Sequence, residues 1–253
     1  MRIIAIAGNT FREALRDKVL LALIVIAVLV TAAAKIVPPL AVGEGAKIVK
    51  DLGLATMTLF CVLIAILVGG RLIYKEVEKR TILTLLAKPV RRWEFVLGKY
   101  CGLMLVLIIS VALMTLWFTL FLLLTHVPLD IRLLLPIAML VLELGIVTAV
   151  SILFSTFTTP ISSTVFAFAT YFAGNMSRDL LALAAMNKSL LVKALARFCY
   201  YLLPNFSNLD FRALVIHNQL LDPGQVLWAI AYSAIYTTAL LLIAILIFQR
   251  RNF

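Results

Sequence analysis

The chain has 253 residues, of which 64% are hydrophobic, and its formal net charge is +11. Soluble domains are only about half apolar, so this composition excludes an ordinary soluble enzyme and indicates a protein solvated by lipid. The positive charge does not indicate a nucleic-acid-binding protein, because the basic residues lie between apolar runs, as in loops beside anionic headgroups.

Residues 1–18 are expected to form an amphipathic helix in the membrane interface. Apolar residues recur there at helical spacing, and charged or polar residues occupy the other face. A short tail whose periodicity arises by chance is the alternative. The expected apolar face comprises Ile3, Ile4, Ala7, Phe11, Ala14 and Leu15.

Six apolar runs follow, and each is expected to cross the membrane as a helix. About 20 apolar residues span a hydrocarbon core of about 30 Å. The sequence therefore predicts an all-α, polytopic membrane protein in which residues 1–253 form a single transmembrane domain. The first run is expected to stay uncleaved, because it is longer than a typical signal-peptide core. The predicted spans are residues 19–37, 52–74, 98–124, 133–154, 161–176 and 226–248.

A long segment, residues 177–225, separates the fifth and sixth predicted spans and is expected to be extracytoplasmic. Its middle, Leu190 to Leu203, is apolar but holds Lys193 and Arg197 within only 14 residues. This stretch is too short and too charged to span a bilayer. It is expected to be an interfacial or re-entrant helix on the outer side.

The distribution of basic residues predicts the orientation of the chain. Placing the N-terminus inside puts 14 of the 23 Lys and Arg residues on the inner side and spreads nine over a longer outer sequence. The positive-inside rule then favours a multi-pass protein of the plasma membrane with both termini in the cytoplasm.

The charged segment between the second and third predicted spans, residues 75–97, is expected to hold a cytoplasmic helix. Glu76 and Arg80 are four residues apart, as in helix-supporting ion pairs, and Pro89 would end the helix. A solvated connection could be much shorter, so the extra length favours docking of a protein partner. Anchoring of positive charge without any partner is the alternative. The apolar residues at helical spacing are Val77, Ile82, Leu85 and Leu86.

Known catalytic and nucleotide-binding motifs are missing from the sequence. There is no GxxxxGK[ST] phosphate loop, and neither HExxH nor GxSxG occurs. His126 and His217 are expected to be interfacial polar residues, because no second ligand lies near either one at metal-binding spacing. The sequence thus predicts no catalytic residue, metal or cofactor in this chain.

Two features inside the predicted spans could serve packing or transport. Ser163, Ala167, Thr170 and Gly174 place small residues at helical spacing, which lets helices approach closely in lipid. A lipid-facing helix that has small residues by chance is the alternative. Glu143 is a carboxylate in mid-span, which costs about 2.5–3.5 kcal/mol on insertion scales. It is therefore expected to face protein or a cavity, where it either contacts substrate or holds the bundle together.

Three stretches of the sequence resemble a known family. One contains Glu76, Glu78 and Thr81, followed by Leu85-Leu86-Ala87-Lys88-Pro89-Val90, Arg92 and Gly98-Lys99. The others are Asn9-Thr10-Phe11-Arg12-Glu13 with Arg16-Asp17-Lys18, and Leu203-Pro204-Asn205-Phe206 with Asp210-Phe211 and the ending Phe248-x-Arg250-Arg251-x-Phe253. In this order they resemble type-2 ABC export permeases, most closely the branch named for multi-copper enzyme maturation. Arg80 departs from the pattern, since many relatives have glycine there.

The resemblance implies that two permease chains, identical or paralogous, pair and that each docks on a separate ATP-binding subunit, which holds ATP and Mg. It implies that the second and fifth spans line the dimer axis and that the outer segment caps the exit. It names no substrate. A membrane scaffold that is not a conduit, within an ATP-driven protein assembly, is the alternative, and an intramembrane enzyme centred on Glu143 is a third hypothesis. The implied coupling residues are Glu76, Glu78, Thr81, Leu85, Leu86, Pro89 and Arg92, and the implied translocation path includes Ser163, Ala167, Thr170, Gly174 and Glu143.

Overall fold

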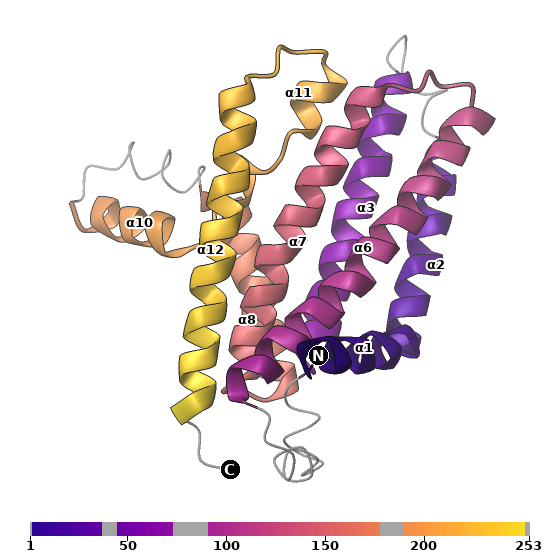
Figure 1. Ribbon diagram of the computed structural model, residues 1–253. Helices are drawn as coiled ribbons and strands as arrows, with labels where there is room; N and C mark the ends of the chain where they lie inside the picture. The colour runs from indigo at the N-terminus through magenta and orange to yellow at the C-terminus, as the bar shows by residue number, and fades with distance from the viewer. Residues whose placement is uncertain (1, 37–44, 73–90, 178–189, 251–253) are drawn as a thin grey trace.

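The computed structural model describes residues 2–36, 45–72, 91–177 and 190–250, and every regular element within them is helical. Six helices run alternately up and down a bundle (Figure 1). Those six are α2 (Lys18–Ala33), α3 (Gly45–Gly69), α6 (Arg92–Leu124), α7 (Leu134–Ser155), α8 (Pro160–Asn175) and α12 (Pro223–Arg250). The shorter elements are α1 (Arg2–Leu15), α10 (Leu190–Leu202), α11 (Arg212–Ile216), and the 3-10 turns η1 (Ala34–Ile36), η3 (Ile131–Leu133) and η4 (Phe206–Asn208).

Four stretches of the described chain are long and apolar enough to cross a membrane, which confirms a polytopic membrane protein. They are α3, α6, η3 together with α7, and α12. The predicted first and fifth spans correspond to α2 and α8, which have 16 residues each. Both are shorter than the roughly 20 residues of a typical span, so the total of six spans stays a prediction.

The helices extend further than the apolar runs that predict them. α3 begins at Gly45 rather than at Leu52, and α6 begins at Arg92 rather than at Gly98. The hydrocarbon core determines which part of a helix must carry apolar side chains. The helix itself can continue beyond that part, because polar residues also form the backbone hydrogen bonds of a helix. At the start of α6, the Arg91 N–H donates to a Glu94 carboxylate oxygen at 2.9 Å, as in a capping box. The last part of the predicted loop, residues 92–97, is therefore helical.

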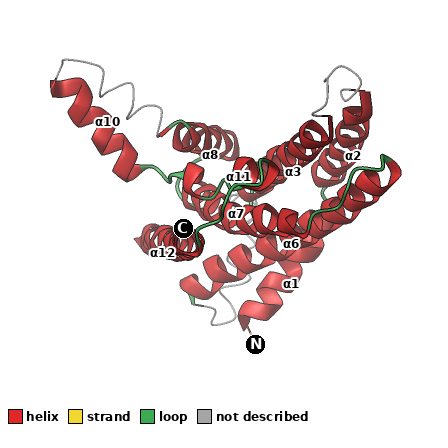
Figure 2. Ribbon diagram, turned by 90° about the horizontal axis from the view of Figure 1, so that it is seen from above, coloured by secondary structure: helices red, strands yellow, loops and turns green. Residues whose placement is uncertain are grey.

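α7 lies at the centre of the bundle, with α3, α6, α8 and α12 around it (Figure 2). Its residues from Glu143 to Ile152 are all buried. A helix that is apolar on every side is expected in the middle of a bundle rather than at its surface. The turn after α7 is short because Thr159 caps α8 and Pro160 takes the first helical position, where no backbone donor is lost.

α1 crosses the beginning of α6 at very short range. A Cβ atom on Gly98 would lie 2.7 Å from the Ile6 side chain, and one on Gly102 would lie 2.7 Å from the Ala7 carbonyl oxygen. The predicted apolar face of α1 is divided: Ala7 faces α6, whereas Ile4 is 75% exposed. The interfacial position of α1 stays a prediction, but the structure shows which side of it contacts protein.

The end of the bundle where α1 lies also holds the start of α6 and the end of α12; we refer to it as the α1 end (Figure 1). There Asp17 accepts a hydrogen bond from the Val19 N–H at 2.9 Å and so caps α2. The same carboxylate lies 3.2 Å from the Arg71 guanidinium just after α3. One acidic side chain thus ties the bend between α1 and α2 to the last described turn of the α3 segment.

α10 coincides with the helix predicted before the last span, ending at Leu202 instead of Leu203. It stands to the side of the bundle, nearly perpendicular to α12 and about half-way along it (Figures 1 and 2). Its interfacial or re-entrant character stays a prediction.

The crossing of α1 over α6 predicts a position-specific effect of adding one methyl group. Gly102→Ala should lower the free energy of unfolding by about 1–3 kcal/mol, because the methyl group meets Thr10 and the Ala7 carbonyl oxygen. Gly8→Ala is the control, since nothing lies within 4 Å of the added atom; its stability should be unchanged or rise by up to about 1 kcal/mol. Thermal unfolding in nanodiscs measures both, and equal stability of the two variants would contradict the close crossing.

Candidate functional site

The predicted coupling residues fall largely outside the described chain. Of the seven, the structure describes Arg92 alone, so the helical form and the role of the others stay predictions. The six that lie outside the described residues are Glu76, Glu78, Thr81, Leu85, Leu86 and Pro89.

Arg92 binds the end of α12. Its guanidinium donates hydrogen bonds to the carbonyl oxygens of Phe248, at 3.1 Å, and Gln249, at 2.6 Å. The last carbonyls of a helix have no partner within the helix and carry the negative end of its dipole, so a cation there is favourable. The residue predicted to meet a partner subunit therefore also joins the first turn of α6 to the last turn of α12.

A small apolar cluster reinforces this junction. The Phe95 and Phe248 rings are stacked with centroids 5.6 Å apart, and Val96, Ile152 and Ala244 complete the buried group. Phe248 belongs to the C-terminal stretch that resembles the family, and this contact gives it a structural role. The start of α6, the end of α12 and the end of α7 are thus held together at the α1 end.

Lys99 connects α6 to α1. Its side chain is only 1% exposed, and its Nζ lies 3.7 Å from a carboxylate oxygen of Glu13. Nζ also lies 5.8 Å from the centroid of the Phe95 ring, within the range of a cation–π contact. The Glu13 side chain is 42% exposed, so the ion pair reaches from the surface of α1 to the interior of the bundle.

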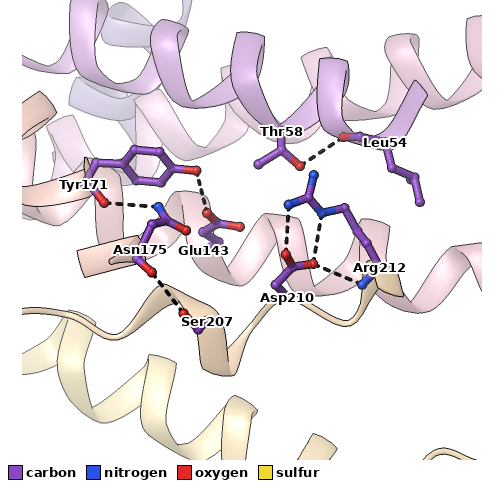
Figure 3. A network of polar contacts seen from close by, with 8 residues as sticks. All are labelled: Leu54, Thr58, Glu143, Tyr171, Asn175, Ser207, Asp210 and Arg212. Atoms are coloured by element: carbon purple, nitrogen blue, oxygen red, sulfur yellow. Dashed lines mark hydrogen bonds and ion pairs between the residues drawn. The ribbon is translucent and has the colours of Figure 1, made fainter. Parts of the chain in front are cut away.

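Glu143 is buried, at 7% exposure, and accepts a hydrogen bond from the Tyr171 hydroxyl at 3.0 Å (Figure 3). Tyr171 lies on α8, and its backbone carbonyl accepts a bond from the Asn175 side chain at 3.1 Å. The carboxylate therefore links α7 to α8. Its other side faces a small cavity that Thr58 of α3 and Arg212 also line. The cavity has a volume of only about 10 Å³, so this arrangement supports a structural role.

Asp210 and Arg212 form a close pair beside that cavity (Figure 3). The Arg212 guanidinium donates to both carboxylate oxygens of Asp210, at 2.9 and 2.8 Å. Burial alone raises the pKa of Asp210, but the hydrogen bonds and charge of Arg212 outweigh it and hold that pKa below its usual value. The segment before the last span thus places a fixed ion pair near the buried carboxylate of α7.

The small residues of α8 contact other parts of the same chain. Ser163 and Ala167 are buried, and the Ser163 hydroxyl donates to the Ser151 carbonyl of α7 at 3.3 Å. Gly174 lies against Pro204 and Phe206, where a Cβ atom would have no space. Their role at a dimer axis stays a prediction, and the structure shows that this face already contacts α7 and the outer segment.

The stretch Leu203 to Phe206 fastens the outer segment to the bundle. The Asn205 N–H donates to the Tyr232 hydroxyl at 2.8 Å, and Phe206 is buried with its ring 5.0 Å from that of Tyr171. Ser207 donates to the Asn175 carbonyl at 3.2 Å. This segment is consequently bound to α8 and to the middle part of α12.

Several of these residues were not predicted from the sequence. Gly98 and Gly102 form a G-x-x-x-G pattern, which is a known signal for close helix contacts in membranes. Tyr171 and Arg212 lie far from Glu143 in sequence, and no spacing rule connects them to it. Only the fold brings these polar side chains together.

A family model described as ABC-2 family transporter protein matches residues 4–253. The chain belongs to this family. No curated protein matched the chain. ABC-2 proteins are the membrane permeases of ABC transporters and typically work with a separate ATP-binding subunit, so this chain is a multi-pass transport component rather than a catalytic one. The narrower branch named for multi-copper enzyme maturation stays a prediction.

In this ABC-2 permease, Arg92 should hold the end of α12 in place. Arg92→Ala should speed amide hydrogen exchange in the last turn of α12 by about fivefold, because about 1 kcal/mol of hydrogen bonding to its carbonyls is lost. Arg91→Ala is the matched control, since that neighbouring side chain is exposed. Exchange that rises equally in both variants would show that Arg92 makes no specific contribution.

The bond between Tyr171 and Glu143 predicts different effects of two substitutions. Glu143→Leu leaves the Tyr171 hydroxyl without its acceptor and should reduce stability by about 1–3 kcal/mol. Glu143→Gln keeps an acceptor oxygen and should cost less than about 1 kcal/mol. Denaturation in detergent compares the two. If Leu is tolerated as well as Gln, the carboxylate does not hold α7 to α8.

Proposed function

We propose that this chain is the membrane-spanning subunit of an ABC exporter in the plasma membrane. A separate ATP-binding subunit docks on the predicted coupling helix, within residues 75–97, and drives the permease between inward-facing and outward-facing states. The N-terminus and the C-terminus lie on the cytoplasmic side, and a second copy or a paralogue completes the pathway.

The observation that carries the proposal is the anchoring of both ends of the predicted coupling segment. Arg71, shortly before residues 73–90, which the structure does not describe, forms an ion pair with Asp17 at the α1–α2 bend. Arg92, just after it, is tied to the last turn of α12. A force applied to a segment moves helices only if its ends are fixed to them. Here both ends have polar contacts to helices distant in sequence.

The contacts of the segment before α12, near the middle of that helix, support an opening and closing movement. The outer segment bridges α8 and α12: Ser207 donates to the Asn175 carbonyl of α8, the Asn205 N–H donates to Tyr232 of α12, and Tyr236 of α12 donates to the Leu202 carbonyl. A displacement of α12 relative to α8 would therefore strain this bridge. The buried pair of Glu143 and Tyr171 lies between the two ends and keeps α7 and α8 together during the movement.

The proposal predicts that ATP turnover depends on residues 76–85. The chain is co-purified with the ATP-binding subunit encoded beside it, and turnover is measured in proteoliposomes. Changing Glu76, Glu78 or Leu85 to Ala should reduce permease-dependent turnover by about tenfold, as for central residues of an interface. Asp130→Asn, at the opposite end of the bundle, is the matched control and should not change it. If all variants bind the subunit and hydrolyse ATP as the unmodified chain does, the coupling assignment is wrong.

A further inference from the structure

A cavity of about 410 Å³ lies between α7, α8, α12 and the end of α10. This volume falls in the range of about 300–1,000 Å³ that is usual for small-molecule sites. It is separate from the small polar cavity beside Glu143. Its lining comprises Val150, Leu153, Phe154, Thr170, Tyr201, Leu202, Leu203, Pro204, Tyr236, Ala239, Leu240 and Ile243.

The cavity lies beside the half of α12 that is nearer the α1 end. Tyr236 and Ile243 bound it on α12, and Ile243 is about 10 Å from the end of that helix at 1.5 Å per residue. The end of α10, half-way along α12, closes it on the other side (Figure 1). Ile243 is 46% exposed and Leu202 is 61% exposed, so the cavity opens sideways, towards the surface that the bilayer covers.

The lining selects an apolar occupant. It contains no charged side chain, and two of its hydroxyls are already used: Thr170 donates to the Phe166 carbonyl and Tyr236 to the Leu202 carbonyl, both at 2.8 Å. Water needs two to four polar partners to be stable in a cavity, and few are free here. In a membrane the abundant apolar species is the lipid acyl chain.

We propose that this cavity binds an acyl chain of an amphiphile that enters sideways from the leaflet on the α1 side. The occupant is a bilayer lipid or a lipid-like molecule, and the polar head stays at the interface beyond the last turn of α7. We further infer that the substrate of the permease belongs to this class of amphiphile. This second inference rests on the proposed function. ATP-driven displacement of α12, which Arg92 holds, would then reshape the wall of the site.

Photolabelling of the full chain tests the site. The probe is a phosphatidylcholine with a diazirine in the middle of one acyl chain, added to phosphatidylcholine–phosphatidylglycerol nanodiscs that hold one permease copy. Labels should concentrate on the α7 peptide containing Leu153 and the α12 peptide containing Leu240. Ala239→Phe should reduce this labelling by about tenfold, because a phenyl group takes the place of several methylenes.

Ala234→Phe is the matched control, because Ala234 is exposed on the same helix but does not line the cavity. Its labelling should equal that of the unmodified chain. Labelling spread evenly over the exposed helices, or unchanged in Ala239→Phe, would overturn the proposal. Labelling that is lost when two copies share a nanodisc would also overturn it, since a second copy would then fill the cavity.

The step to substrate class has a separate readout. Lysophosphatidylcholine should stimulate ATP turnover of the complex about tenfold less in Ala239→Phe than in Ala234→Phe. Equal stimulation would overturn the assignment of the substrate class. Because the labelling uses the permease alone, its failure leaves the coupling proposal intact. If instead the coupling proposal is wrong, photolabelling will be normal, but ATP turnover will be the same in the Glu76 variant as in the unmodified chain.

Discussion

The burial of α7 on every side is the constraint on which the rest of the fold depends. A central helix in a membrane must be contacted by several neighbours at short range, and there is no strong hydrophobic force to bring helices together in lipid. Small residues make this possible: Gly69 of α3 approaches Ser151, and Ser163 of α8 bonds to the carbonyl of the same residue. The same burial requires that Glu143, the carboxylate on α7, receive a polar partner, which α8 supplies.

Much of the fold could be predicted because long apolar runs can satisfy their backbone in lipid only as helices. The helices at 98–124, 133–154 and 226–248 follow from this rule. Their true ends do not, since α3 continues through Lys47, Lys50 and Asp51 before its apolar part begins. Hydropathy indicates which side chains are expected to contact lipid. The end of a helix depends instead on where its backbone groups lose their hydrogen-bonding partners. The division of the predicted apolar face of α1 between protein and surface was also hidden, because Ala7, which is buried, and Ile4, which is exposed, are both apolar.

The candidate site was predictable only in its separate parts. Glu143 could be singled out because a carboxylate in mid-span is costly, but its partner Tyr171 could not, because pairing depends on how two helices pack. Arg92 was assigned to a partner subunit from its place in a family-like stretch, and its contact with α12 could not be anticipated across more than 150 residues of sequence. The place of the small residues of α8 at a dimer axis stays a prediction; within this chain Ser163 contacts α7 and Gly174 contacts the segment before α12.

The two anchors at the α1 end have a mechanical consequence. Arg71 leads through Asp17 to the bend before α2, and Arg92 leads to the tail of α12. α2 and α12 lie on opposite flanks of the bundle (Figure 1). A push or pull on the segment between the two arginines would therefore reach α2 through the Arg71–Asp17 ion pair, and α12 through the hydrogen bonds of Arg92 and the stacked Phe95 and Phe248 rings. In the proposed coupling, one contact with the ATP-binding subunit would move both flanks together, and breaking either polar contact would weaken its hold on one flank.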